Sequence, residues 1–245
     1  MKGSKSGILL YGVLMALIGG AFNNCAGEYP KGDATTAPAS QANEALPETG
    51  PKLIQKTIVP VTATGVVFNI PATEEGSTLV VALAVGSGTN NTITSLSDSA
   101  NTVYVSAGAR ANYLGGATEI WYAKRVPAGV TSLTVTTAGS SFTAHVYEIS
   151  GTSEQPLMSV ASTSFSVPGV THSGPQVNRA NGKAVGLQIA VVDSAISAVS
   201  SPFVVSVDPN GNASAWLADG TAGVLSPTWT LTAFSAFCAS SIIMQ

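Results

Sequence analysis

Two stretches of the chain repeat one another, and this repeat restricts the fold more than any other feature. Each stretch starts at a tryptophan, continues through an Ala-Gly-Val turn and ends in an alternating threonine run. The matching segments are Trp121-Tyr122-Ala123, Ala128-Gly129-Val130 and Thr134-Val135-Thr136, against Trp216-Leu217-Ala218, Ala222-Gly223-Val224 and Thr228-Trp229-Thr230. Both patterns are typical of strand, tight turn and strand. They predict an all-β, antiparallel two-sheet sandwich with an internal pseudo-repeat.

Composition agrees with a β fold and excludes some functions. Charged residues make up 9% of the 245 residues, against about 25% in an ordinary soluble domain. The net charge is −3 and the ten basic residues form no run, so we expect no nucleic-acid partner. Two cysteines do not make a disulfide framework, and we expect Cys238, in the last apolar strand, to be a buried thiol.

The N-terminus has the layout of an export signal. Lys2 and Lys5 precede an apolar run at 8–18, and Gly19-Gly20-Ala21 supplies the small residues that signal peptidase needs. We therefore predict a signal peptide over 1–21 and no transmembrane span in the mature form, because the run is shorter than the ~20 residues of a membrane-spanning helix.

The segment after the signal predicts a tether. Residues 22–52 are rich in Ala, Thr and Pro, which predicts a disordered linker before a single β-sandwich domain over 53–245. Secretion is the expectation and a lipid anchor through Cys25 is the alternative, since the preceding Phe22-Asn23-Asn24 departs from a lipoprotein signal.

Within the domain, strand signals recur at short spacing. Residues 79–85 are apolar on both faces, which predicts a central, covered strand, and residues 184–192 open the second half. The segments 106–117 and 150–182 are predicted loops, and the length of the second makes it the candidate functional loop.

Several segments together resemble a β-sandwich module that recurs in secreted bacterial surface proteins. They are Gly76-Ser77-Thr78-Leu79-Val80-Val81, 97–102, Ile120-Trp121-Tyr122-Ala123, Tyr147-Glu148-Ile149-Ser150-Gly151, Asn210-Gly211-Asn212-Ala213 and Pro227-Thr228-Trp229-Thr230. The resemblance implies a jelly-roll-like or immunoglobulin-like sandwich in an extracellular setting. That module has no general activity, so no catalytic residue carries over.

Metal binding has one candidate. Asp208, Asn210, Asn212 and Asp219 follow part of the spacing of an EF-hand calcium loop, but position six is Ala213 instead of Gly and position twelve is Asp instead of Glu. A turn between two strands explains the same residues, so we expect no cofactor and keep Ca²⁺ as the alternative. His145, in a strand, and His172, in a loop, are predicted edge or loop histidines, because neither has zinc ligands nearby in sequence.

Catalytic candidates are few. No Gly-x-Ser-x-Gly motif is present, which argues against a serine hydrolase. Glu119 and Glu148 would form a glycosidase pair only if their strands were neighbours, and Glu119 is expected to pair with a base across the sheet.

Exposed aromatic rings are the candidate ligand contacts. Trp121, Trp216 and Trp229 are expected to pack, which leaves Tyr104, Tyr113 and Tyr122, with Tyr113 in the 106–117 loop the most exposed.

The prediction is thus an exported, non-enzymatic module that binds a polysaccharide or another cell-surface component. The alternative is a structural subunit of an extracellular assembly or filament that pairs through β-edges. A homo-oligomer is kept among the partner hypotheses. A glycan hydrolase is the third hypothesis.

Overall fold

The computed structural model describes residues 50–61, 65–86, 92–113, 116–138, 141–180, 183–192, 194–217 and 222–245. These residues belong to one compact unit and are all-β, with antiparallel pairing throughout. The all-β antiparallel prediction is confirmed, while the jelly-roll-like or immunoglobulin-like type stays a prediction. The signal peptide, Cys25 and most of the linker lie outside the described residues.

The first sandwich, residues 52–150, has two sheets. The larger has the order β1-β8-β3-β6-β5 and the smaller the order β2-β7-β4. The strands are β1 (Lys52–Val61), β2 (Val66–Asn69), β3 (Ser77–Gly86), β4 (Ile93–Asp98), β5 (Val105–Tyr113), β6 (Gly116–Val126), β7 (Ser132–Thr137) and β8 (Phe142–Ser150).

Residues 157–245 contain one branched sheet. We call this region the second sandwich because its long strands β9 and β16 take part in both of its layers. The strand order of the branched sheet is β12-β16-β11-β14-β13. Strands β12 and β11 pair with different parts of β16 along one side, and β9 pairs along the opposite side. A β10-β15 pair forms a separate small sheet. The strands are β9 (Leu157–Ser173), β10 (Val177–Arg179), β11 (Val185–Val192), β12 (Ile196–Val199), β13 (Val204–Val207), β14 (Ala213–Leu217), β15 (Gly223–Leu225) and β16 (Thr228–Met244).

The two sandwiches repeat the same strand order once two long strands are each counted twice. The second half of β16 lies between β9 and β11 as β8 lies between β1 and β3, and its first half lies between β9 and β12 as β7 lies between β2 and β4. Strands β14 and β13 then correspond to β6 and β5. The pseudo-repeat predicted from the tryptophan-led segments therefore extends through the strand order of the whole domain.

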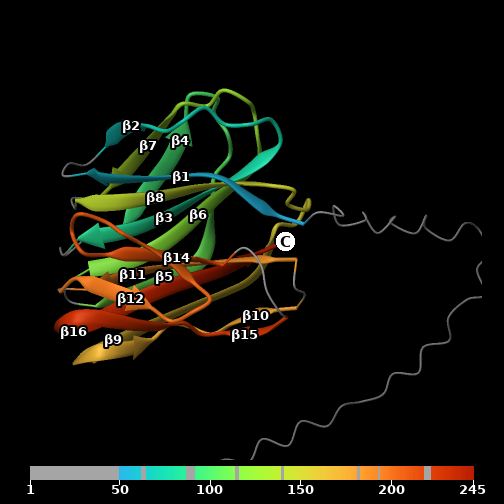
Figure 1. Cartoon of the computed structure of the whole chain (residues 1–245). Helices are drawn as coiled ribbons and strands as arrows, with labels where there is room; N and C mark the ends of the chain where they lie inside the picture. The colour runs from blue at the N-terminus through green and yellow to red at the C-terminus, as the bar shows by residue number, and fades with distance from the viewer. Residues whose placement is uncertain are drawn as a thin grey trace, which may run out of the picture. The chain divides into compact units, whose positions relative to one another are not determined.

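The described part of the chain forms four sheets rather than the two predicted, and these sheets stack in layers (Figure 1). A first core lies inside the first sandwich, a middle core lies between the larger sheets of the two sandwiches, and a third core lies inside the second sandwich. Strand β3 supplies alternate residues to two of these: Leu79, Val81, Leu83 and Val85 to the first core, and Val80, Ala82 and Ala84 to the middle core. This confirms the prediction that residues 79–85 form a central strand covered on both faces.

The two repeated tryptophans lie on corresponding strands but face opposite sides. Trp121 pairs with Val81 and packs against the first core, whereas Trp216 pairs with Leu187 and lies in the middle core, stacked on Tyr147. A register difference of one residue sends a strand's side chains to the other face of the sheet. The sequence repeat is therefore offset by one residue from the structural repeat at this strand.

Two predicted loops are strands instead. The 106–117 segment belongs largely to β5 and β6, because Ala107, Ala109 and Ala111 alternate into the middle core. The 150–182 segment contains β9 and β10, so it is not a long functional loop. Its Pro168 is compatible with a strand because β9 lies at a sheet edge, where a missing N–H breaks no ladder.

Small side chains on β5 allow it to approach the second sandwich, and this generates a first prediction. Ala109 is 1% exposed in the middle core, so Ala109→Leu adds volume to a filled space and should cost about 1–3 kcal/mol of unfolding free energy. Ala128→Leu, in an exposed turn, is the matched control and should stay within about 0.5 kcal/mol of the parent. Urea unfolding of both variants measures the difference; equal costs would contradict the packing described for β5.

Candidate functional site

A surface groove lies where β5 and β6 meet the turn after β4. Its cavity volume is about 520 Å³ and its lining residues are Ala100, Thr102, Val103, Val105, Tyr122, Lys124, Arg125 and Pro127. Val103 is 78% exposed and Val105 42%, and Tyr122 is half-buried. The groove thus combines exposed apolar side chains, one aromatic ring and two cations.

A β-bulge directs the two cations to the solvent side of the groove. The register between β3 and β6 shifts between Ser77 and Leu79, opposite the segment that contains Lys124 and Arg125. Arg125 has a φ of 54°, which a non-glycine residue rarely adopts, and both side chains are exposed. Bulges of this kind re-aim side chains and break the strict alternation of a strand.

The segment before β9 holds these cations in place. Lys124 Nζ donates to the main-chain oxygen of Glu154 at 2.8 Å, and Arg125 forms an ion pair with the Glu154 carboxylate. The three side chains together carry one net positive charge at the rim of the groove.

The turn that carries Val103 is braced by a buried carboxylate. Asp98 Oδ1 accepts hydrogen bonds from the amides of Ala100 (2.9 Å) and Thr102 (3.0 Å), and its Oδ2 accepts one from the Tyr104 hydroxyl (3.0 Å). Burial alone would raise the pKa of Asp98, but the hydrogen bonds from Thr102, Tyr104 and Ala100 outweigh it and lower that pKa. The turn geometry beside the groove therefore depends on an ionised Asp98.

The three candidate tyrosines fall in three different environments. Tyr104 is 8% exposed and bonded to Asp98, so its ring is not available as a surface contact, and burial raises the pKa of its hydroxyl. Tyr113 is half-buried at the end of β5 and packs against the middle core rather than in an exposed loop. Only Tyr122 lines the groove.

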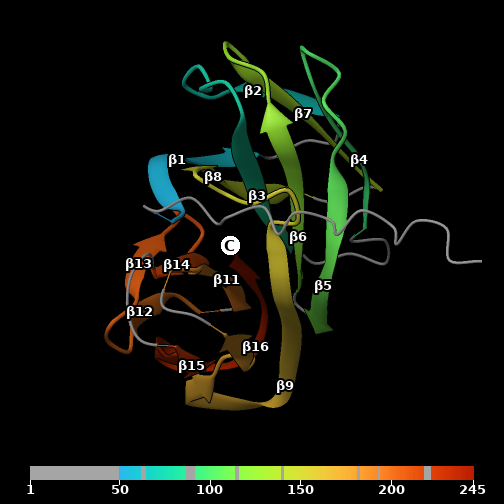
Figure 2. The same cartoon turned by 90° about the vertical axis from the view of Figure 1, so that its right-hand side faces the viewer.

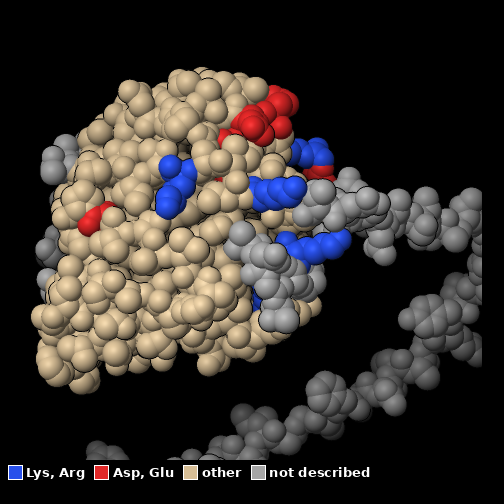
Figure 3. Space-filling model, in the orientation of Figure 1, with Lys and Arg blue, Asp and Glu red and all other residues tan. Residues whose placement is uncertain are grey.

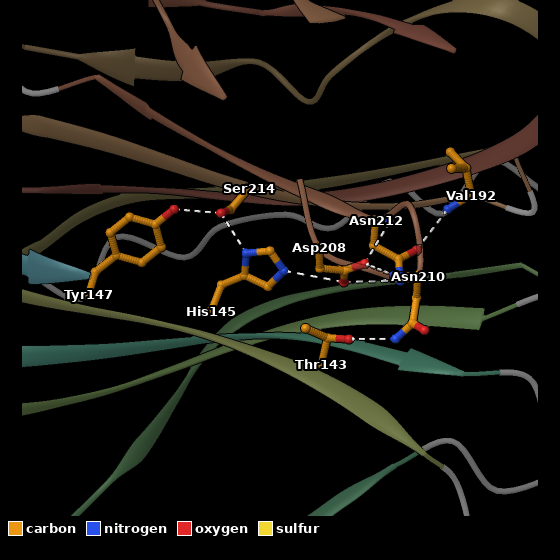
Figure 4. Close-up of polar contacts among 8 residues, drawn as sticks. All are labelled: Thr143, His145, Tyr147, Val192, Asp208, Asn210, Asn212 and Ser214. Atoms are coloured by element: carbon orange, nitrogen blue, oxygen red, sulfur yellow. Dashed lines mark hydrogen bonds and ion pairs between the residues drawn. The ribbon is translucent and has the colours of Figure 1, made fainter. Parts of the chain in front are cut away.

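A second polar cluster lies inside the domain, where β8 meets β14 and the turn before it (Figure 4). His145 Nδ1 lies 2.7 Å from Ser214 Oγ, and His145 Nε2 lies 3.5 Å from Asp208 Oδ2. The Tyr147 hydroxyl also contacts Ser214 Oγ. Figure 4 shows these side chains in one row between the two sheets.

One assignment of protons satisfies every donor in this row. Tyr147 O–H donates to Ser214, Ser214 O–H donates to His145 Nδ1, and His145 Nε2–H donates to Asp208. Burial raises the pKa of Tyr147 to about 12, although its hydroxyl contacts to Ser214 and Ser206 act in the opposite direction. The row therefore links the first sandwich to the second by consecutive hydrogen bonds.

The sequence residues considered for calcium form a turn instead. Asp208 Oδ1 accepts the amides of Asn210 (2.7 Å) and Asn212 (3.1 Å), and Gly211 takes a φ of 86°. Burial alone would raise the pKa of Asp208, but the hydrogen bonds from His145, Thr143 and Asn210 together lower it. This turn joins β13 to β14, as the sequence alternative predicted, and Asp219 lies outside the described residues.

A Ser-His-Asp row is also the set of groups that a serine hydrolase uses, but its placement here does not serve that chemistry. Ser214 and His145 are 0% exposed and Asp208 is 5% exposed, so no substrate carbonyl reaches Ser214 Oγ. Ser214 lies within β14 rather than on a strand-to-helix turn. The arrangement supports a structural role, and no signal in the sequence joined Ser214 to His145.

The predicted positions of both histidines are wrong. His145 lies on β8 between β1 and β3, not at an edge, and His172 lies in β9, where it stacks on Phe237 at 5.0 Å. Within the described ranges, no cluster of three or more His, Cys, Asp or Glu side chains could hold a metal. Cys238 is buried as expected, with Sγ 4.0 Å from the oxygen of Gly116.

Glu119 and Glu148 lie on strands that are not neighbours, because β3 separates β6 from β8. They pair with Leu83 and Leu79, so two strand spacings and four residue rises place them roughly 17 Å apart, beyond the ~5–10 Å of a glycosidase pair. Glu119 instead pairs across the sheet with Arg110 at 3.9 Å. Burial raises the pKa of Glu119, and the nearby charge of Arg110 offsets only part of this effect. Glu148 accepts the Ser77 hydroxyl at 2.7 Å and the Glu74 amide at 2.6 Å.

Comparisons with protein-family models, with curated proteins and with solved structures found no match to this chain in any of the three. The resemblance to a surface-protein module stays a prediction. In the part of the chain that the structure describes, no helix meets the length and hydropathy of a membrane span.

The buried row predicts a measurable loss of stability. Ser214→Ala leaves His145 Nδ1 and the Tyr147 hydroxyl without their partner and should lower the unfolding free energy by about 1–3 kcal/mol. Ser97→Ala, on an exposed position of β4, should change it by less than about 0.5 kcal/mol. Denaturant unfolding compares the two variants. An unfolding free energy of Ser214→Ala equal to that of the parent would show that the row does not stabilise the contact between the sandwiches.

The Asp208 carboxylate predicts a pH dependence of defined sign. Its pKa is lowered in the folded state, so its contribution is complete above the unfolded value of about 4 and is lost as pH falls through the lower folded pKa. The stability difference between the parent and Asp208→Asn should therefore be largest near neutral pH and shrink in acid. Unfolding free energies measured from neutral pH down to about pH 2 test this, and a difference that grows in acid would contradict it.

Proposed function

We propose that the protein is an exported, non-enzymatic binding module, and that the Tyr122 groove binds a polysaccharide or another cell-surface component. The observation that carries the proposal is the composition of the groove: a half-buried tyrosine ring next to the exposed Val103 and Val105. Amphipathic rings supply apolar contact area together with a polar handle, which suits a ligand made of sugar rings.

The bulge supports the same proposal with a preference for charge. Lys124 and Arg125 are consecutive, both exposed and next to Tyr122, so a ligand on the ring lies within reach of at least one cation. Arg and Lys bind carboxylates and sulfates through charge-assisted hydrogen bonds. Within polysaccharides, the groove therefore favours one that carries carboxylate or sulfate groups.

Export to the cell surface, by secretion or by a lipid on Cys25, belongs to this proposal and rests on the N-terminal sequence alone. A hydrolase is a weaker hypothesis, because Glu119 and Glu148 lie on separated strands and have partners within the fold.

Binding of the full chain to neutral and acidic polysaccharides, with and without Ca²⁺, tests the proposal. Tyr122→Ala should weaken binding about tenfold or more, because a central aromatic contact is typically worth more than 1 kcal/mol. Tyr113→Ala is the matched control and should bind like the parent, since Tyr113 does not line the groove. Binding to an acidic polysaccharide should also weaken as salt rises.

Saturable binding that survives Tyr122→Ala but fails with Tyr113→Ala would place the site elsewhere and overturn the assignment of the groove. Binding to none of the polysaccharides would overturn the polysaccharide proposal itself.

A further inference from the structure

Strand β9 forms a long free edge of the second sandwich. It pairs with β16 over most of its length, with interruptions at 158, 166–168 and 170, and no described strand pairs with its other side. Figures 1 and 2 both show β9 at the outer border of the molecule, below β16 in Figure 1. A polar groove of about 330 Å³, lined by Arg110, Ala111 and Asn112 of β5 and by 162–164 of β9, runs beside this border. The edge of β9 is therefore reachable from solvent.

Between Ser159 and Phe165, β9 lacks the devices that keep sheet edges apart, because its register shifts against β16 lie outside this stretch, at 157–159 and at 165–171. Its 17 residues include no Lys, Arg, Asp or Glu, and Pro168 interrupts only the last third. Proteins normally protect long edge strands with charges, prolines or short length.

The other edges of the described sheets carry such devices. Strand β1 contains Lys52, Lys56 and Pro60, and β5 contains Arg110 and a bulge. Strands β2, β12 and β13 have four residues each, and β4 has six and ends at Asp98. Among the described edges, β9 is thus the long and uncharged one.

The surface around β9 favours contact with a like surface. Val160 is 43% exposed and Phe165 37%, while Val167 on β9 and Phe234 on β16 are each 76% exposed. Of the charged residues described in the second sandwich, Arg179 and Asp208 are buried and only Lys183 is exposed. In Figure 3 the lower part of the molecule, where Figure 1 places β9 and β16, is almost continuous uncharged surface. Arg110 of β5 also lies beside this edge, but it is ion-paired with Glu119, which limits the repulsion between like charges when two copies meet here.

We propose that two copies of the chain pair through β9, antiparallel and about a two-fold axis, over residues 160–167. This stretch ends before Pro168 and has the usual length of a strand. An antiparallel edge paired with itself is self-complementary, because each N–H that faces outward meets an outward C=O of the other copy. The pairing joins the two second sandwiches into one continuous sheet. It is independent of the Tyr122 groove, which lies on the first sandwich.

Sedimentation of the full chain over a wide range of concentration tests the proposal. The parent should form a dimer that dissociates on dilution. Ser164→Lys places two cations near the two-fold axis and should weaken the dimer about tenfold or more. Val167→Lys, at the end of the paired stretch, is the second variant and should weaken it as well.

Ser97→Lys is the matched control, because Ser97 is also an exposed serine on an edge strand, β4. It should leave the dimer unchanged, which also separates β9 from association through the apolar N-terminal segment that all variants share. Far-UV circular dichroism should show that every variant keeps its β structure.

Three results would overturn the proposal: a parent that is monomeric at every concentration, equal weakening by Ser164→Lys and Ser97→Lys, or open-ended growth into filaments instead of a closed dimer. None of these depends on polysaccharide binding, so failure here and failure of the groove proposal are distinguishable.

Discussion

Burial of both faces of the central five-stranded sheet is the constraint on which the rest of the structure depends. Strand β3 alternates between the first core and the middle core, so every one of its residues from Leu79 to Val85 is at most 2% exposed. A sheet buried on both faces needs a layer on each side, and the chain provides these layers as the smaller sheet of the first sandwich and the larger sheet of the second. The two halves of the chain are thereby joined into one domain instead of two.

The middle core combines small apolar side chains with a row of polar ones. Alanines on β3 and β5 pack against Val, Leu and Ile side chains of β11, while His145, Ser214 and Asp208 hydrogen-bond at the end of the same interface. Buried polar groups cost free energy unless every member has a partner, and this row is closed by the Asp208 turn. The row therefore specifies how the two sandwiches are aligned, because apolar contact alone has no direction.

The surfaces available for binding are divided between the two sandwiches. Charges and the Tyr122 groove lie on the first sandwich, whereas the second exposes Lys183 as its one described charge and presents the free edge of β9. This separation means that a ligand in the groove and a partner at the β9 edge would not compete for the same residues. A surface module that also associates with itself would present more than one groove to a repeating ligand, which strengthens weak binding.

The sequence by itself determined the all-β class, the repeat, the covered strand at 79–85 and the strand at 184–192, because these depend on alternation and turn residues that are local. It also identified Trp229 as core and the 208–212 segment as a turn. Only the tertiary structure decided that β5 and β9 are strands, since alanine, serine and threonine carry little periodic signal until a facing layer buries one side. It likewise decided that Tyr122 rather than Tyr113 lies in a groove and that Ser214, His145 and Asp208 meet, because contacts between residues far apart in the chain depend on how sheets stack and on a one-residue register.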